Sequence, residues 1–149
     1  MENVRSHHVV AWWTSGRTGL AKSDSAPNAI HFTAPTESGD VQGRWTPEDL
    51  LLTALAACFT TTFHSITSYP KFAYIDLQVE VDGTVSKIDS GYGFSEIVIR
   101  PNLTITGEEN RERAISLLQK TAKLCLVSRA LTNAPKFEIA VEIRKQSLA

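Results

Sequence analysis

Residues 46–63 read Thr-Pro-Glu-Asp-Leu-Leu-Leu-Thr-Ala-Leu-Ala-Ala-Cys-Phe-Thr-Thr-Thr-Phe, and this stretch predicts a long helix. Thr46 is a favourable N-cap, and Pro47 suits the first helical position because its missing N–H would have no acceptor there. Glu48 and Asp49 place negative charge at the positive end of the helix dipole. We expect the helix to end near Ser68, just before a proline.

From Leu50 to Phe63 the predicted helix is apolar or small on every side. A helix of this composition requires burial all round, which one sheet face cannot supply. A second copy of the chain is therefore the expected source of the remaining cover. The stretch has 14 residues, and we expect a buried helix rather than a membrane span.

The rest of the chain predicts strands and one further helix. Period-two alternation and turn residues indicate the strands, and Thr106 with Glu109 resembles a capping box at the start of the second helix. The order predicts an α+β fold in a single domain, residues 1–149. The expected strands are His8–Thr14, Ala29–Thr33, Ile75–Lys87, Phe94–Ile105 and Phe137–Ile143, with a tight turn at 15–19, a polar loop at Thr36–Arg44 and a hairpin turn at 89–91.

Composition excludes several classes of function. A formal charge of −1 over 149 residues gives no basic surface for nucleic acid or for an anionic membrane. The first eight residues contain no apolar core typical of a secretory signal. Two cysteines without such a signal favour the cytoplasm, where cysteine pairs tend to be catalytic or redox-sensing.

Cys58 and Cys125 are the only cysteines, and both lie in segments that we expect to be helical. They are either two buried hydrophobic side chains or one redox unit. Cys125 continues an apolar stripe at spacings of three and four, which predicts that it faces the core. The four histidines show no metal-ligand spacing with the cysteines, so no metal site is expected. The stripe consists of Ile115, Leu118, Ala122 and Cys125, and the histidines are His7, His8, His31 and His64.

Four motifs together resemble the OsmC/Ohr family of organic hydroperoxide reductases. They are Gly16-Arg17-Thr18-Gly19, Thr46-Pro47-Glu48-Asp49-Leu50-Leu51, Ala54-Leu55-Ala56-Ala57-Cys58-Phe59 and Leu124-Cys125-Leu126-Val127-Ser128. The likeness extends over about residues 8–144. It implies an intertwined homodimer with antiparallel β-sheets wrapped around central helices.

The resemblance also implies roles for four residues. Cys58 matches the peroxidatic cysteine, Cys125 the resolving cysteine, Arg17 the arginine that activates the thiolate, and Glu48 its carboxylate partner. Arg44 is the alternative source of positive charge. Family members of the best-known branches have proline after the second cysteine, where this chain has Leu126.

Glu48 and Cys58 are ten residues apart on one helix, or roughly 15 Å along its axis. Within one subunit Glu48 can hardly touch the thiolate. Either Arg17 bridges this gap or Glu48 comes from the partner subunit. We therefore predict a site at the dimer interface.

The resemblance implies an antioxidant peroxidase of the oxidative stress response. It would reduce organic hydroperoxides to alcohols through a Cys58 sulfenic acid and a Cys58–Cys125 disulfide, with no metal, flavin or haem. An external dithiol, of lipoyl type by resemblance, would reduce the disulfide. Phe59, Phe63 and Trp45 would favour organic peroxides over hydrogen peroxide. Two alternatives remain: a non-catalytic dimer that binds a hydrophobic small molecule in the same interfacial pocket, and a purely structural dimer.

Overall fold

The structure, a computed structural model, describes residues 4–35, 41–89 and 91–145. It divides into an N-terminal unit, residues 1–51, and a C-terminal unit, residues 52–149. The fold is α+β, as predicted; a single domain stays a prediction. The elements are β1 (Val9–Ser15), β2 (Thr18–Ser23), β3 (Ala26–Thr33), α1 (Pro47–Ser68), β4 (Asp76–Ile88), β5 (Gly91–Ile105), η1 (Glu108–Asn110), α2 (Arg111–Leu124), α3 (Leu126–Arg129), β6 (Lys136–Phe137) and β7 (Ala140–Ile143).

The N-terminal unit is a three-stranded antiparallel sheet in the order β1-β2-β3. Gly16 has a φ of 56° in the turn between β1 and β2, a conformation that favours glycine. The strand β2 was not predicted, because its small residues have low strand propensity. It forms because it pairs with β1 on one side and with β3 on the other. Part of the predicted loop Thr36–Arg44, residues 36–40, lies outside the described residues.

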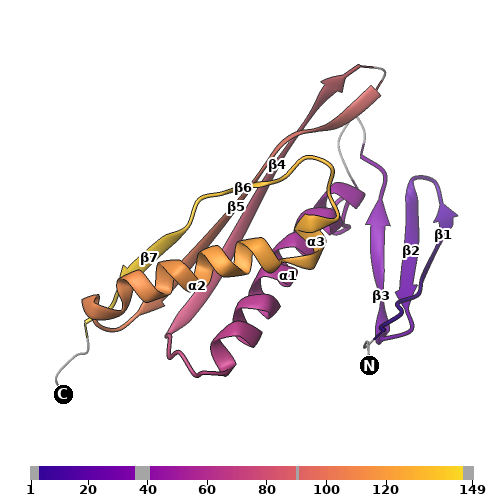
Figure 1. Ribbon diagram of the computed structural model, residues 1–149. Coiled ribbons are helices and arrows are strands. Elements are labelled where there is room, and N and C mark those ends of the chain that lie inside the picture. Colours follow the sequence, from indigo (N-terminus) through magenta and orange to yellow (C-terminus); the bar gives the residue numbers. More distant parts are fainter. Residues whose placement is uncertain (1–3, 36–40, 90, 146–149) are drawn as a thin grey trace. The chain divides into compact units, whose positions relative to one another are not determined.

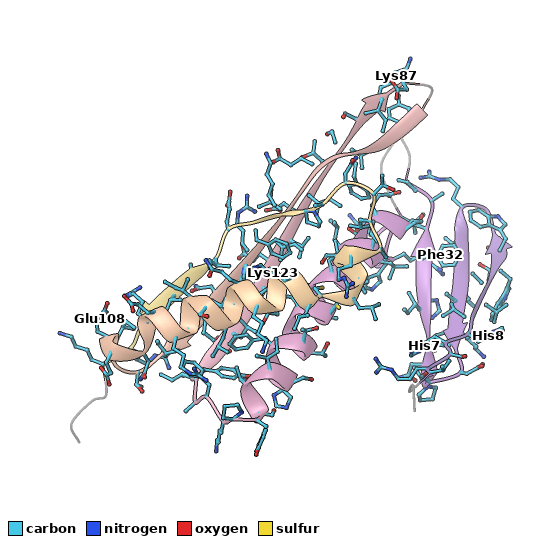
Figure 2. The ribbon with its side chains drawn as sticks, in the orientation of Figure 1. His7, His8, Phe32, Lys87, Glu108 and Lys123 are labelled. Atoms are coloured by element: carbon cyan, nitrogen blue, oxygen red, sulfur yellow. The ribbon has the colours of Figure 1, made fainter. Side chains whose placement is uncertain are left out.

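The sheet of the C-terminal unit is built around the long antiparallel hairpin of β4 and β5. Its register places Leu77 opposite Leu103 and Val81 opposite Ile99, so that apolar side chains share one face. The predicted last strand is two short strands, β6 and β7, which both run parallel to β5. Figure 2 shows Lys87 at the far end of the β4–β5 hairpin.

The core of the C-terminal unit lies between this sheet and two helices that pack on the same face (Figure 1). α1 contributes a stripe at intervals of four residues, and Phe59 and Phe63 pack against Phe137 and Tyr74 with ring centroids 6.1 and 5.2 Å apart. This packing fixes the position of the middle of α1 against the sheet. The fully buried core residues are Leu55, Phe59 and Phe63 of α1, Ile99, Leu103 and Ile105 of β5, and Ala114 and Leu118 of α2.

The start of α1 is confirmed where the sequence predicts it. The backbone N–H of Asp49 donates to Thr46 Oγ1 at 3.1 Å, and the N–H of Thr46 donates to Asp49 Oδ2 at 3.0 Å. This reciprocal capping satisfies an N–H that has no intrahelical partner. α1 ends at Ser68, also as predicted.

The predicted capping box at Thr106 and Glu109 is wrong. Gly107 adopts a φ of 81°, and a short 3₁₀ helix precedes α2, which begins at Arg111. The Arg111 guanidinium pairs with Glu108 at 2.6 Å, while Asn110 Nδ2 donates to the Thr106 carbonyl. In Figure 2, Glu108 marks this end of α2 and Lys123 lies toward the other end.

By length and composition alone, α1 could cross a membrane. This differs from the expectation drawn from Leu50–Phe63, a stretch too short to span one. Its Leu55, Phe59 and Phe63 stripe is instead packed in a protein core. Outside this stripe, the other sides of α1 are half-buried or exposed, apart from Thr67. The expected burial of this helix on every side, supplied by a second copy of the chain, stays a prediction.

Candidate active site

Cys58 lies in the middle of α1, one position before the fully buried Phe59. Its side chain is half-buried, so that the sulfur sits at the edge of the core and not within it. Thr62, one turn later, places its Oγ1 at 3.9 Å from Cys58 Sγ. The helix thus presents the thiol on a rigid support together with a hydroxyl donor.

Cys125 lies at a break in the chain between α2 and α3. Its φ of −62° and ψ of 110° are extended, which corrects the expectation that it sits inside a helix. Its own N–H still donates to the Thr121 carbonyl at 3.0 Å. The side chain is 0% exposed, so the predicted core-facing orientation is confirmed.

The structure brings the two thiols together. The Cys125 thiol is hydrogen-bonded to the Cys58 sulfur, and the backbone N–H groups of Leu126 and Val127 donate to the same sulfur. These N–H groups begin α3, where the first turn of a helix leaves donors without intrahelical acceptors. The break at Cys125 therefore directs three donors at Cys58.

The surroundings shift the pKa values of the two thiols in opposite directions. Burial raises the pKa of Cys58, but hydrogen bonds from Val127, Cys125, Thr62 and Leu126 outweigh it, and the pKa lies below its ordinary value. Burial, together with the neighbouring Cys58 sulfur, raises the pKa of Cys125 despite two hydrogen bonds from Ser128. Cys58 is consequently the more acidic thiol of the pair, and Cys125 the less acidic one.

The other predicted site residues belong to the N-terminal unit. Arg17 is half-buried and donates from Nη2 to the Ala34 carbonyl at 3.4 Å. Arg44 donates from Nη1 to the Gly19 carbonyl at 3.3 Å. Glu48 is half-buried in the first turn of α1. The roles of Arg17 and Glu48, and the alternative of Arg44, stay predictions.

The predicted aromatic surface for a substrate requires a correction. Phe59 and Phe63 are 0% exposed and fill the core, so they cannot contact a substrate; Trp45 is exposed. The exposed apolar side chains beside Cys125 are Leu124 and Leu126. Sequence reasoning named Leu126 only as a departure from the family motif and missed its backbone donor.

A bound metal ion would need a set of ligating side chains close together. Within residues 4–35, 41–89 and 91–145, no three His, Cys, Asp or Glu side chains come together in a group that could hold a metal ion. The chemistry that this arrangement supports is that of a paired thiolate and thiol.

Residues 38–140 match the family model of the OsmC-like proteins. The chain belongs to the OsmC family. The uncharacterized protein YmaD of Bacillus subtilis is 22% identical over 95% of this chain and 97% of its own. Two solved structures share the fold. An OsmC-like protein of Vibrio cholerae has a TM-score of 0.77 and 17% identity, over 91% of this chain and 99% of that one. An organic hydroperoxide resistance protein of Elizabethkingia anophelis has a TM-score of 0.75 and 22% identity, over 97% of this chain and 100% of that one.

Leu126→Pro is expected to make Cys58 of this OsmC-family protein less reactive. Proline removes the N–H that reaches Cys58, and it suits both the first position of α3 and the extended backbone of Cys125 before it. The pKa of Cys58 should therefore rise, and its alkylation should become severalfold slower at neutral pH.

The measurement is the rate of iodoacetamide alkylation of Cys58 against pH, with modified peptides identified by mass. In the wild type this rate should level off at a lower pH than for an ordinary thiol, because only the thiolate reacts. Leu126→Ala keeps the N–H and should match the wild type. Coincident pH profiles for Leu126→Pro and Leu126→Ala would contradict the assignment.

Proposed function

We propose that this OsmC-family protein is a cysteine-based peroxidase that reduces organic hydroperoxides to alcohols. The observation that carries the proposal is the contact between Cys58 and Cys125, with their pKa values shifted apart. A thiol with a lowered pKa at the edge of the core and a buried thiol against it match the requirements of a peroxidatic and a resolving cysteine.

The Cys58 thiolate attacks the terminal peroxide oxygen, and the O–O bond breaks to release an alcohol after proton uptake. Cys58 is left as a sulfenic acid. Cys125 then attacks the Cys58 sulfur, water leaves, and a disulfide forms. An external dithiol of lipoyl type restores both thiols by exchange, so no resident metal, flavin or haem takes part.

The charged residues of the N-terminal unit act on the peroxide in this proposal. Arg17 stabilises the Cys58 thiolate and orients the peroxide, and Glu48 holds the guanidinium. Arg44 is the alternative for this role. The proposed location is the cytoplasm, where an external dithiol is available.

A homodimer is part of the same proposal. α1 buries one stripe in its own core and leaves apolar residues on its other sides partly accessible. Large apolar side chains are also exposed on both units, among them Trp12 and Trp13 of β1 and Tyr92 of β5. A second copy is the proposed cover for these residues.

The substrate class follows from the apolar side chains beside the thiols. Leu126 is 65% exposed, and its backbone donates to Cys58. An alkyl or aryl group on the peroxide would bury apolar surface there, whereas hydrogen peroxide has none to bury. We therefore propose that organic hydroperoxides react faster than hydrogen peroxide.

The test is reaction of the fully reduced wild type with one equivalent of cumene hydroperoxide, followed by intact mass under denaturing conditions. We expect loss of two hydrogens per chain, with formation of one equivalent of cumyl alcohol. Hydrogen peroxide in a parallel reaction should act more slowly. A wild type that leaves cumene hydroperoxide unchanged would refute the peroxidase and favour the alternative, a dimeric binding protein for a hydrophobic small molecule.

A further inference from the structure

Ser128 contacts the second cysteine in two ways that the proposed reaction has not used. Its side chain is buried at 7% exposure, and Oγ donates to the Cys125 carbonyl at 3.0 Å. Its backbone N–H and its hydroxyl also reach the Cys125 sulfur. Ser128 therefore supplies hydrogen-bond donors to the Cys125 sulfur, as Leu126 and Val127 do to the Cys58 sulfur.

The two sulfurs differ in their access to solvent. Cys125 is 0% exposed, whereas Cys58 is half-buried and reachable at the edge of the core. A thiolate attacks a disulfide along the line of the S–S bond and expels the far sulfur. An external dithiol would therefore attack Cys58 and expel Cys125.

Expulsion creates a negative charge where water has no access. A buried thiolate without hydrogen-bond donors is strongly disfavoured, and this cost falls on the transition state of disulfide reduction. Donors aimed at the departing sulfur lower the barrier because they interact more strongly with the thiolate than with the disulfide. The donors placed at Cys125 are those of Ser128.

We propose that Ser128 is a catalytic residue of the reductive half-reaction, which stabilises the Cys125 thiolate as it leaves. The inference rests on the proposed Cys58–Cys125 disulfide. In the step, a dithiol thiolate forms a bond to Cys58 Sγ, the Cys58–Cys125 bond breaks, and its electron pair stays on Cys125. The second sulfur of the dithiol then attacks the dithiol sulfur that is bonded to Cys58. The Cys58 thiolate leaves, and the reductant becomes a cyclic disulfide. The two dithiol protons pass to solvent or to the freed thiolates.

The hydroxyl has one proton for two acceptors. In the neutral state it is donated to the Cys125 carbonyl, and rotation about the Cβ–Oγ bond can direct it to the sulfur when charge develops there. Formation of the disulfide depends less on Ser128, because a lower thiol pKa raises the thiolate fraction but lowers its nucleophilicity. Leaving-group stabilisation has no such compensation.

The test uses the full chain, oxidised with diamide to the disulfide and confirmed by mass. The wild type, Ser128→Ala and Ser128→Thr are mixed with excess dihydrolipoamide, and samples are quenched with acid at successive times and alkylated. Intact mass then gives the fraction of each protein that has been reduced. We expect Ser128→Ala to be reduced about tenfold more slowly, the size of effect from losing one hydrogen bond to a charged group. Ser128→Thr, which keeps the hydroxyl, should be reduced at nearly the wild-type rate.

A second measurement does not depend on any variant. A monothiol, 2-mercaptoethanol, is added to the oxidised wild type, and the mixed disulfide is trapped by alkylation and located by peptide mass. The adduct should lie on Cys58, with the alkyl group on Cys125. An adduct on Cys125, an unchanged reduction rate in Ser128→Ala, or failure of diamide to form the Cys58–Cys125 disulfide would overturn the inference. A wild type that shows the expected exchange but consumes no peroxide would refute the peroxidase and leave the role of Ser128 standing.

Discussion

Cys58→Ser is expected to abolish peroxide reduction. Serine is nearly the same size as cysteine and can keep the contact with Thr62, so α1 and the core behind it should fold unchanged. Its hydroxyl is not ionised near neutral pH, however, and hydrogen bonds that favour a thiolate cannot make it a comparable nucleophile. Cumene hydroperoxide consumption should fall to the rate without protein.

The matched control is the parallel measurement on Cys125→Ser, which retains Cys58 and should still consume one equivalent. Circular dichroism and thermal unfolding of Cys58→Ser should agree with the wild type, because the Cys58 side chain is only half-buried. If Cys58→Ser consumed peroxide over many turnovers, the proposed identity of the peroxidatic residue would be wrong.

Local signals in the sequence predicted the elements that local chemistry determines. Thr46 and Asp49 cap α1 through their own side chains and backbone, so the helix start could be located from four neighbouring residues. The alternation that includes Leu77 and Val81 likewise indicated β4 before any pairing was known. Both features depend on residues close together in the chain.

The errors occur where distant contacts decide the backbone. No glycine or proline marks the break at Cys125, and the apolar periodicity continues through it. The break follows from packing, because it keeps Cys125 buried while α3 begins against Cys58. At Thr106 the opposite error arose: a capping pattern was present, but Gly107 took a conformation that started a 3₁₀ turn first.

The candidate site shows the same division. Cys58 and Cys125 could be named from residue type and family resemblance, and the structure brings them into contact. The donors that distinguish the two sulfurs are the N–H groups of Leu126 and Val127 and both groups of Ser128. Backbone donors have no signature in residue type, so residue types alone could not show that these groups lower the pKa of Cys58.

Cys125→Ser is expected to stop the reaction after its first step. Cys58 should still attack peroxide, because serine retains an O–H donor where the Cys125 thiol donates to Cys58. Without a second thiol the product is the Cys58 sulfenic acid, and the mass should rise by one oxygen where the wild type loses two hydrogens. Dimedone should trap this sulfenic acid, and a second equivalent of peroxide should convert it to the sulfinic acid.

Cys125→Ala separates the two roles of this residue. Alanine also prevents the disulfide, but it removes the donor to Cys58, so the pKa of Cys58 should rise and its oxidation at neutral pH should be slower than in Cys125→Ser. The serine variant carries its own cost, since a hydroxyl at a site with 0% exposure can lower stability by about 1–3 kcal/mol where its hydrogen bonds are incomplete. Stopped-flow peroxide consumption and urea unfolding of both variants distinguish these effects. Cys58 sulfenic acid that accumulates in the wild type to the same extent as in Cys125→Ser would show that Cys125 is not the resolving cysteine.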